Sequence, residues 1–201
     1  VSPGKSLVSP TAKPMVTGDK ALSSAAADKS LVAAVATNTL AGAQALHRAK
    51  NYVTAIDACD TIIAKGGLEE RAAQKLKAQC LCGLQRYPEA VTCWTALLER
   101  DLKSADNDDL LLQIGRTSAF AMTNPVQGRV YYERLFKEWP NSGLMQEAQY
   151  QYAGSFFVQQ DYATAMALLN QFVKENPNHN LASKAQQYIA QCEAKGAKVV
   201  V

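Results

Sequence analysis

Small and large apolar positions recur along the chain at a nearly constant distance from about residue 36 onward. Larger apolar residues follow seven positions after the second of two columns of Ala or Gly. The steps within each column are 35 to 38 residues, so the pattern predicts repeats that are each built from two closely crossing helices. The first small column holds Ala43, Ala78, Gly115 and Ala153, the second holds Ala55, Ala90, Gly128 and Ala165, and the larger residues are Ile62, Leu97, Leu135 and Phe172.

The helical period together with start and stop signals predicts nine helices joined by short connections. Asn124 before Pro125 is typical of a helix start, and Asn141-Ser142, Asp161 and Asn178 are further cap candidates. Pro140 and Pro177 predict helix ends. The expected helices cover about 30–48, 51–65, 69–84, 88–101, 107–122, 125–138, 142–158, 161–175 and 179–195.

The first 29 residues differ from the rest, because they show no apolar period and hold three of the seven prolines. We expect residues 1–29 to form an extended Pro/Ala/Lys-containing tether and residues 30–201 to form the repeat domain.

Composition agrees with a helical fold. The 201 residues include 33 alanines, and only 7% are aromatic. Alanine has the highest helix propensity, whereas sheets favour β-branched and aromatic residues, so the composition disfavours an all-β fold. The net charge of +3 is too small to indicate a nucleic-acid-binding protein, and no apolar run reaches the length of a membrane span.

The repeat resembles the tetratricopeptide repeat (TPR). The fourth repeat carries the small residue, tyrosine, alanine, large apolar residue and proline of that motif as Ala153, Tyr162, Ala165, Phe172 and Pro177. The first and second repeats lack the proline. The third has proline for tyrosine and one extra residue, which we expect in its turn. No repeat has the tryptophan that is frequent in the family's first helix. The matching repeats cover about 36–67, 71–102, 108–140 and 146–177, with 179–195 as a cap.

This resemblance implies an all-α, right-handed α-solenoid of about four helix pairs and a C-terminal capping helix. It also implies a non-catalytic protein–protein interaction scaffold, in which the first helix of each pair lines a concave groove for a partner peptide or helix. The resemblance implies nine groove positions, which are Leu40, Gln44, His47, Lys75, Gln79, Leu112, Arg116, Tyr150 and Phe157. The clamp for a C-terminal carboxylate that chaperone-binding members use is incomplete, because Leu40 and Gln44 stand at its first positions.

Loose spacing and the aromatic-to-proline segments 136–140 and 172–177 are similar to repeats of bacterial periplasmic and outer-membrane-associated proteins, such as the Tol-Pal coordinator and the barrel-assembly lipoprotein. The resemblance implies a periplasmic or outer-membrane-associated location in a cell-envelope assembly. A cytosolic adaptor, a self-assembling structural protein that forms homo-oligomers and an enzyme accessory domain are the alternatives.

Candidate chemistry is sparse, so we predict no enzyme activity, cofactor or metal site. His47 and His179 lie near opposite ends of the repeats, and no phosphate-binding glycine loop occurs. The loop at 106–109 lacks the alternating ligands of a calcium site and is interpreted as a helix cap with favourable charge. The basic residues Lys65, Arg71, Lys75 and Lys77 are expected on a solvated helix face.

Aromatic and sulfur-containing side chains are assigned mainly to the core. Trp94 and Tyr132 occupy one helix-packing column together with Cys59 and Leu169. The five cysteines are interpreted as small buried apolar residues. A disulfide that joins Cys59 to Cys80, Cys82 or Cys93 is the alternative.

Overall fold

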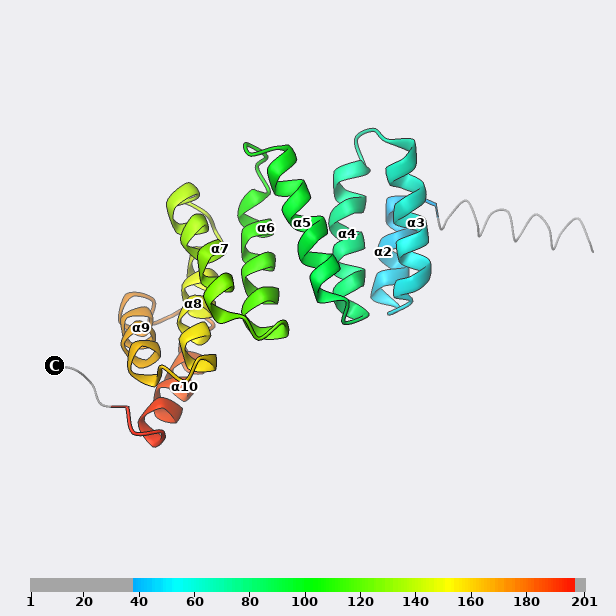
Figure 1. Ribbon diagram of the computed structural model, residues 1–201. Coiled ribbons are helices and arrows are strands. Elements are labelled where there is room, and N and C mark those ends of the chain that lie inside the picture. The colour runs from blue at the N-terminus through cyan, green and yellow to red at the C-terminus, as the bar shows by residue number, and fades with distance from the viewer. Residues whose placement is uncertain (1–37, 198–201) are drawn as a thin grey trace, which may run out of the picture. The chain divides into compact units, whose positions relative to one another are not determined.

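The computed structural model describes residues 38–197, and every regular element within them is a helix (Figure 1). The predicted bounds agree with the observed ones within a few residues after the first helix. The helices are α2 (Leu40–Arg48), α3 (Tyr52–Lys65), α4 (Glu70–Gly83), α5 (Tyr87–Arg100), α6 (Asn107–Arg116), the π-helix η1 (Thr117–Ala121), α7 (Pro125–Glu138), α8 (Met145–Val158), α9 (Tyr162–Glu175) and α10 (Ala182–Ala194).

The helices form a solenoid of antiparallel pairs, as the repeat pattern predicts. Each helix packs against the next one along the chain, and α2 also packs against α4 of the following pair. The pairs are α2/α3, α4/α5, α6/α7 and α8/α9, and α10 packs on α9 as the capping helix (Figure 1).

The predicted start of the first helix at residue 30 is wrong for residues 38–39, which are not helical. The hydroxyl of Thr39 accepts a hydrogen bond from the Gly42 amide at 3.1 Å, so that α2 begins at Leu40. Residues 30–37 and the predicted tether at 1–29 lie outside the described residues.

All eight positions of the two small columns are buried where helices cross. The third repeat shows why two of them are glycine. A Cβ atom at Gly128 would lie 2.6 Å from Cβ of Ala119 and 2.7 Å from the carbonyl oxygen of Gly115. At this crossing the backbones approach too closely for any side chain.

The extra residue of the third repeat lies in its first helix, and its predicted place in the turn is wrong. After Arg116 the helix widens into the π-helix Thr117–Ala121, where the amide of Met122 donates to the carbonyl of Thr117. A π-turn accommodates one inserted residue without ending the helix. The insertion therefore leaves Gly115 and Gly128 in their column and shifts only the residues between them.

The core follows the predicted packing column. Cys59, Trp94, Tyr132 and Leu169 are all buried, and the larger residues seven positions after the second small column are buried with them.

The cysteines differ in burial. Cys80 and Cys192 are buried like Cys59, whereas Cys82 and Cys93 are half-buried. All five thiols are unpaired in the structure.

Two of the predicted caps are confirmed. The side chains of Asn124 and Asp161 accept hydrogen bonds from the amides of Gln127 and Thr164. The predicted caps at 141–142 and Asn178 are wrong, because α8 and α10 begin three or four residues later. These two connections contain a turn before the helix, as the amides of Met145 and Ala182 show by donating to carbonyls three residues earlier.

Candidate interaction surface on α2, α4 and α6

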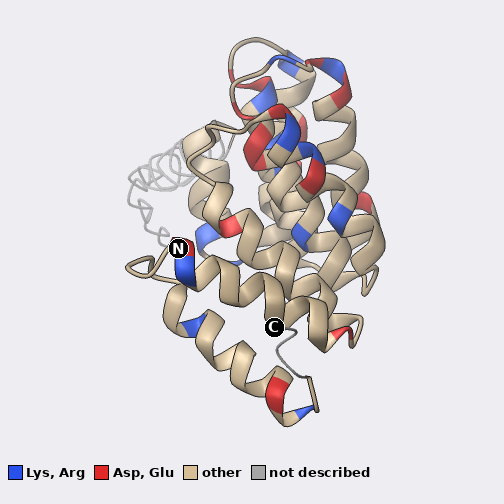
Figure 2. Cartoon of the chain, turned by 90° about the vertical axis from the view of Figure 1, so that its left-hand side faces the viewer, with Lys and Arg blue, Asp and Glu red and all other residues tan. Residues whose placement is uncertain are grey.

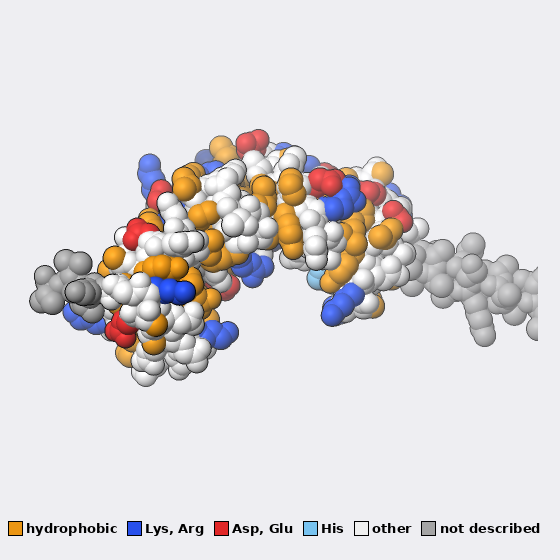
Figure 3. Space-filling model, turned by 60° about the horizontal axis from the view of Figure 1, so that its bottom comes forward, with side chains coloured by type: hydrophobic (Ala, Val, Ile, Leu, Met, Phe, Trp, Pro, Cys, Tyr) orange, Lys and Arg blue, Asp and Glu red, His pale blue; other side chains and the backbone are white. Residues whose placement is uncertain are grey.

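Two adjoining hollows lie over the first helices of the first three repeats. One has a volume of about 480 Å³ and is formed by α2, α4, α5, α6 and η1, and the other has about 510 Å³ and is formed by α2, α4 and the connections that precede α4 and α6. Both are lined by His47 and Gln79, so they form one continuous surface, which we call the α2–α6 hollow. Figure 3 shows the described helices indented along one side, with basic side chains near the indentation.

Five of the nine predicted groove residues meet in this hollow. Gln44 and His47 come from α2, Lys75 and Gln79 from α4, and Arg116 from the end of α6. Because the helix pairs stack on one another, residues about one repeat apart in sequence become neighbours. The structure thus brings these five predicted positions together on one surface.

The other four predicted positions lie elsewhere. Leu112 is only 2% exposed, so its predicted place on the groove surface is wrong; it faces the core of α5, α6 and α7. Leu40 is half-buried and packs on the core of the first pair. Tyr150 and Phe157 are half-buried, and both pack edge-on against Tyr188 of the capping helix at ring distances of 6.2 and 5.1 Å.

Several lining residues were not anticipated from the sequence. Tyr87 begins α5, Trp94 lies about two turns further along the same face, and Phe120 and Ala121 come from the π-helix. Tyr87 occupies the tyrosine position of the repeat motif, so the sequence identifies it. Its exposure to the hollow, however, depends on how the neighbouring helices pack. Thr117 and Phe120 reach the hollow only because the π-turn rotates this end of the helix, and no sequence pattern predicts that rotation.

Charged residues of two repeats form one network at the edge of the hollow. Arg71 donates to Oδ1 of Asp106 at 2.8 and 2.9 Å, to Oδ1 of Asn107 at 2.8 Å and to the Leu97 carbonyl at 3.2 Å. Nζ of Lys75 lies 2.9 Å from Oδ2 of Asp106 and 2.8 Å from Oδ2 of Asp109. The network joins the second repeat to the loop that opens the third.

This network corrects two predictions. Arg71 and Lys75 do not lie on a solvated face, because their side chains are only 20% exposed and are paired. The carboxylate of Asp106 does not cap α6, since it is bound by Arg71, Lys75 and Ser104. Figure 2 shows acidic and basic residues gathered at the end of the helices that carries the α3–α4 and α5–α6 connections.

The network also shifts the protonation equilibria of its members. Burial by itself would raise the pKa of Asp106, but hydrogen bonds from Arg71, Lys75 and Ser104 lower it well below the usual range. Burial would lower the pKa of Lys75, and its hydrogen bonds to Asp109 and Asp106 outweigh that effect and raise it. Both shifts favour the charged forms, so Asp106 and Lys75 are charged at neutral pH.

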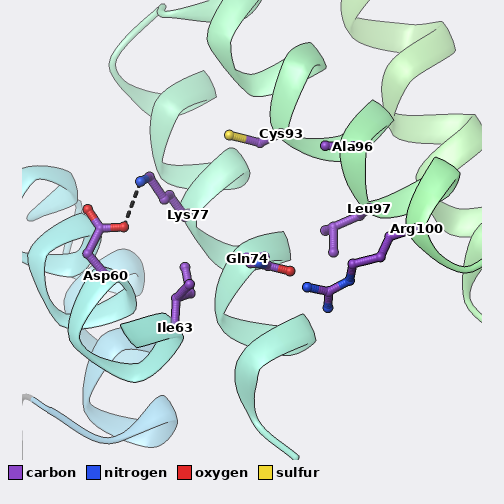
Figure 4. Close-up of a pocket in the computed structure, with 8 residues that line it drawn as sticks. All are labelled: Asp60, Ile63, Gln74, Lys77, Cys93, Ala96, Leu97 and Arg100. Atoms are coloured by element: carbon purple, nitrogen blue, oxygen red, sulfur yellow. Dashed lines mark hydrogen bonds and ion pairs between the residues drawn. The ribbon is translucent and has the colours of Figure 1, made fainter. Parts of the chain in front are cut away.

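A second kind of depression lies on the other side of the helix pairs. It has a volume of about 270 Å³, lies between α3, α4 and α5, and recurs two repeats later between α7, α8 and α9. Its cations are paired: Lys77 lies 2.6 Å from Asp60, and Arg100 lies 2.6 Å from Glu70. Figure 4 shows Asp60, Lys77 and Arg100 together with Cys93 and Leu97, which also line this depression.

Residues 38–197 contain no cluster of three or more His, Cys, Asp or Glu side chains placed to hold a metal ion. His47 and His179 are both half-buried beside an aromatic ring, that of Tyr52 for His47 and that of Phe172 for His179. Among the same residues no helix is long and apolar enough to cross a membrane.

Comparisons with known proteins agree with the helical repeat architecture. Residues 147–179 match the family pattern of the tetratricopeptide repeat. A comparison with curated proteins finds no match. Crystal structures of nearly identical TPR-like repeats from Podosopora anserina resemble the chain at 15% identity with TM-scores of 0.64 and 0.62, over 77% of this chain and 83% of theirs.

A tetratricopeptide repeat protein from Parabacteroides merdae has a TM-score of 0.60 at 15% identity. The likeness covers 76% of this chain and 58% of that one. At this identity the likeness establishes the fold, whereas the match to the family pattern identifies the repeat itself. The chain is therefore a helical solenoid similar to tetratricopeptide-repeat proteins, and its residues 147–179 match the tetratricopeptide repeat.

Proposed function

We propose that this chain is a protein–protein interaction scaffold that binds a segment of a partner protein in the α2–α6 hollow. Tetratricopeptide repeats are typical of such scaffolds, and a solenoid of stacked helix pairs offers a preformed surface. The observation that carries the proposal is the hollow itself, which combines half-buried aromatic rings with polar and basic side chains that do not belong to the core.

The composition of the hollow favours a peptide or helix over a small molecule. Leu68 is fully exposed at one border, and the rings of Tyr87 and Phe120 are half-buried at the other. Apolar anchors of this kind contribute most of the binding free energy in protein interfaces, with polar groups at the rim. The hollow is also open and shallow, whereas sites for small ligands enclose most of the ligand surface.

The proposal is tested by panning a display library of random 12-residue peptides against the full chain and measuring affinities of the enriched peptides by fluorescence anisotropy. Ala121 is exposed and lines the hollow, so Ala121→Trp fills it without changing the core. We expect this variant to weaken binding at least about tenfold. The matched control Ala167→Trp places the same side chain at an exposed position of α9, outside the hollow, and should leave binding unchanged.

A second readout uses two thiols of similar burial. Cys82 lines the hollow, and Cys93 lines the depression between α3 and α5 on the other side. A bound peptide should slow alkylation of Cys82 and leave that of Cys93 unchanged. Recovery of no peptide, or equal binding to both tryptophan variants, would overturn the proposal.

A further inference from the structure

The α2–α6 hollow has an unbalanced charge. Its lining includes four cationic side chains, those of Arg48, Arg71, Lys75 and Arg116, but only one carboxylate, that of Asp106. Arg71 and Lys75 are held by Asp106 and Asp109. The excess positive charge therefore comes from Arg48 and Arg116.

These two arginines differ from the other five in the described part of the chain. Arg71, Arg86, Arg100 and Arg134 each form an ion pair with a carboxylate. Arg129 bonds to Gln159 and lies 4.2 Å above the Phe156 ring. Within residues 38–197, neither Arg48 nor Arg116 forms an ion pair, and the one hydrogen bond of Arg116 goes to the neutral Oε1 of Gln113.

Both arginines without an ion pair line the hollow together with His47, one of the two residues that its halves share. Arg48 follows His47 at the end of α2, and Arg116 lines the same hollow as His47 from the end of α6. A ligand that lies along the hollow past His47 therefore meets cationic side chains from both α2 and α6, together with the rings of Tyr87 and Phe120.

Resting on the proposed function, we infer that the partner segment is an acidic peptide, whose Asp or Glu carboxylates pair with Arg48 and Arg116 while an apolar side chain packs on Tyr87 and Phe120. Arginine binds carboxylates through two parallel hydrogen bonds, and the pairing is strengthened where a ligand displaces water. A nucleic acid is disfavoured, because only two arginines are free and the nearby Trp94 ring is buried and unable to stack on a base.

The test compares Arg48→Gln/Arg116→Gln with the control Arg100→Gln/Arg134→Gln. The control loses the same two charges outside the hollow, and both its arginines are paired with carboxylates. We expect library peptides enriched on the full-length protein to be rich in Asp and Glu. We expect the hollow variant to bind them about 10- to 100-fold more weakly, and the control to bind them within about twofold.

Two further arms use defined probes. The tightest peptide is also made with every Asp and Glu replaced by Asn and Gln. Wild-type protein should bind this neutral peptide as weakly as the hollow variant binds the acidic one. The hollow variant should bind the neutral and acidic peptides with nearly equal affinity. A fluorescein-labelled 12-nucleotide single strand should bind more weakly than the acidic peptide.

Enrichment of neutral or basic peptides that still compete for the hollow would overturn the acidic preference and leave the proposed function standing. Equal binding by the two double variants, or tighter binding of the nucleic acid, would also overturn it. Recovery of no peptide would remove the proposed function and this inference together.

Discussion

Gly115 of α6 lies against the ring of Tyr132 of α7, so closely that a Cβ atom at position 115 would lie 2.7 Å from Cε1 of that ring. Both residues are buried, and the ring has no exposed side toward which it could move. The contact joins a position of the first small column to a position of the aromatic packing column within one repeat. It makes the glycine a requirement of the fold.

Gly115→Ala should therefore destabilise the protein, although alanine is the better helix former. Overpacking of a closed core costs about 1–3 kcal/mol, against a gain of about 1 kcal/mol in helix propensity. We expect a net loss of up to about 2 kcal/mol in the free energy of unfolding, measured by urea denaturation. The control Gly154→Ala is the same change within α8, where the new Cβ would lie 3.3 Å from Phe120, and it should be neutral or stabilising. Equal effects of the two changes would show that the Tyr132 contact is not the cause.

Tyr132→Phe should leave stability unchanged or raise it by up to about 1 kcal/mol. The hydroxyl of Tyr132 is buried and forms no hydrogen bond within the described residues, and burial raises its pKa. Removing a buried hydroxyl that has no partner removes a desolvation cost. Tyr152→Phe is the comparison, because the hydroxyl of Tyr152 donates to Glu133 at 3.1 Å. Removing that hydrogen bond should lower the free energy of unfolding slightly. A clear destabilisation by Tyr132→Phe would mean that its hydroxyl is satisfied in solution.

Asp106→Asn should destabilise the junction between the second and third repeats and lower the free energy of unfolding by about 1–2 kcal/mol. A fully buried pair would contribute more, but the Asp106 side chain is partly exposed and solvent screens its charge. The variant loses the charge that faces Arg71 and Lys75, while Arg71 keeps Asn107 and Lys75 keeps Asp109. The control Glu138→Gln breaks an exposed pair with Arg134 on the same helix and should cost less than about 0.5 kcal/mol. Urea denaturation measures both.

The effect of Asp106 should also depend on pH. Its pKa is lowered in the folded protein, so its stabilisation is complete above the ordinary aspartate pKa of about 3.9 and is lost as the pH falls below that value toward the folded pKa. The difference in unfolding free energy between wild type and Asp106→Asn should therefore shrink between pH 6 and pH 3. A difference that stays constant over this range would contradict the role assigned to the carboxylate.

The five thiols should react in two groups. Burial raises the pKa of Cys59 to about 12 and that of Cys80 to about 11, and neither side chain is exposed. In native protein at pH 8 we expect N-ethylmaleimide to modify Cys82 and Cys93, which are half-buried, well before Cys59, Cys80 and Cys192. Peptide mapping by mass spectrometry identifies the order, and early labelling of Cys59 would show that the first helix pair opens readily.

The repeat could be predicted from the sequence alone, because the spacing of small residues is a direct consequence of helix crossing. Ala43, Ala55 and their counterparts fix which helices pair, and Pro140 and Pro177 fix where two of them end. The position of Trp94 and Tyr132 in the core followed from the same period. These features depend on contacts that recur in each repeat, so the same pattern of residues appears several times along the chain.

Features that occur once in the chain could not be predicted in this way, because they depend on how the helices pack in three dimensions. The pairing of Arg71 and Lys75 with Asp106 joins residues about one repeat apart whose charges, taken separately, are typical of solvated surface. The π-turn at Thr117–Ala121 absorbs an insertion that the sequence places equally well in a turn. Leu112 is buried in the core and Tyr150 packs on Tyr188 of α10, so neither lies in the α2–α6 hollow. Such positions depend on how neighbouring helices rotate against each other, and a local pattern carries no information about that rotation.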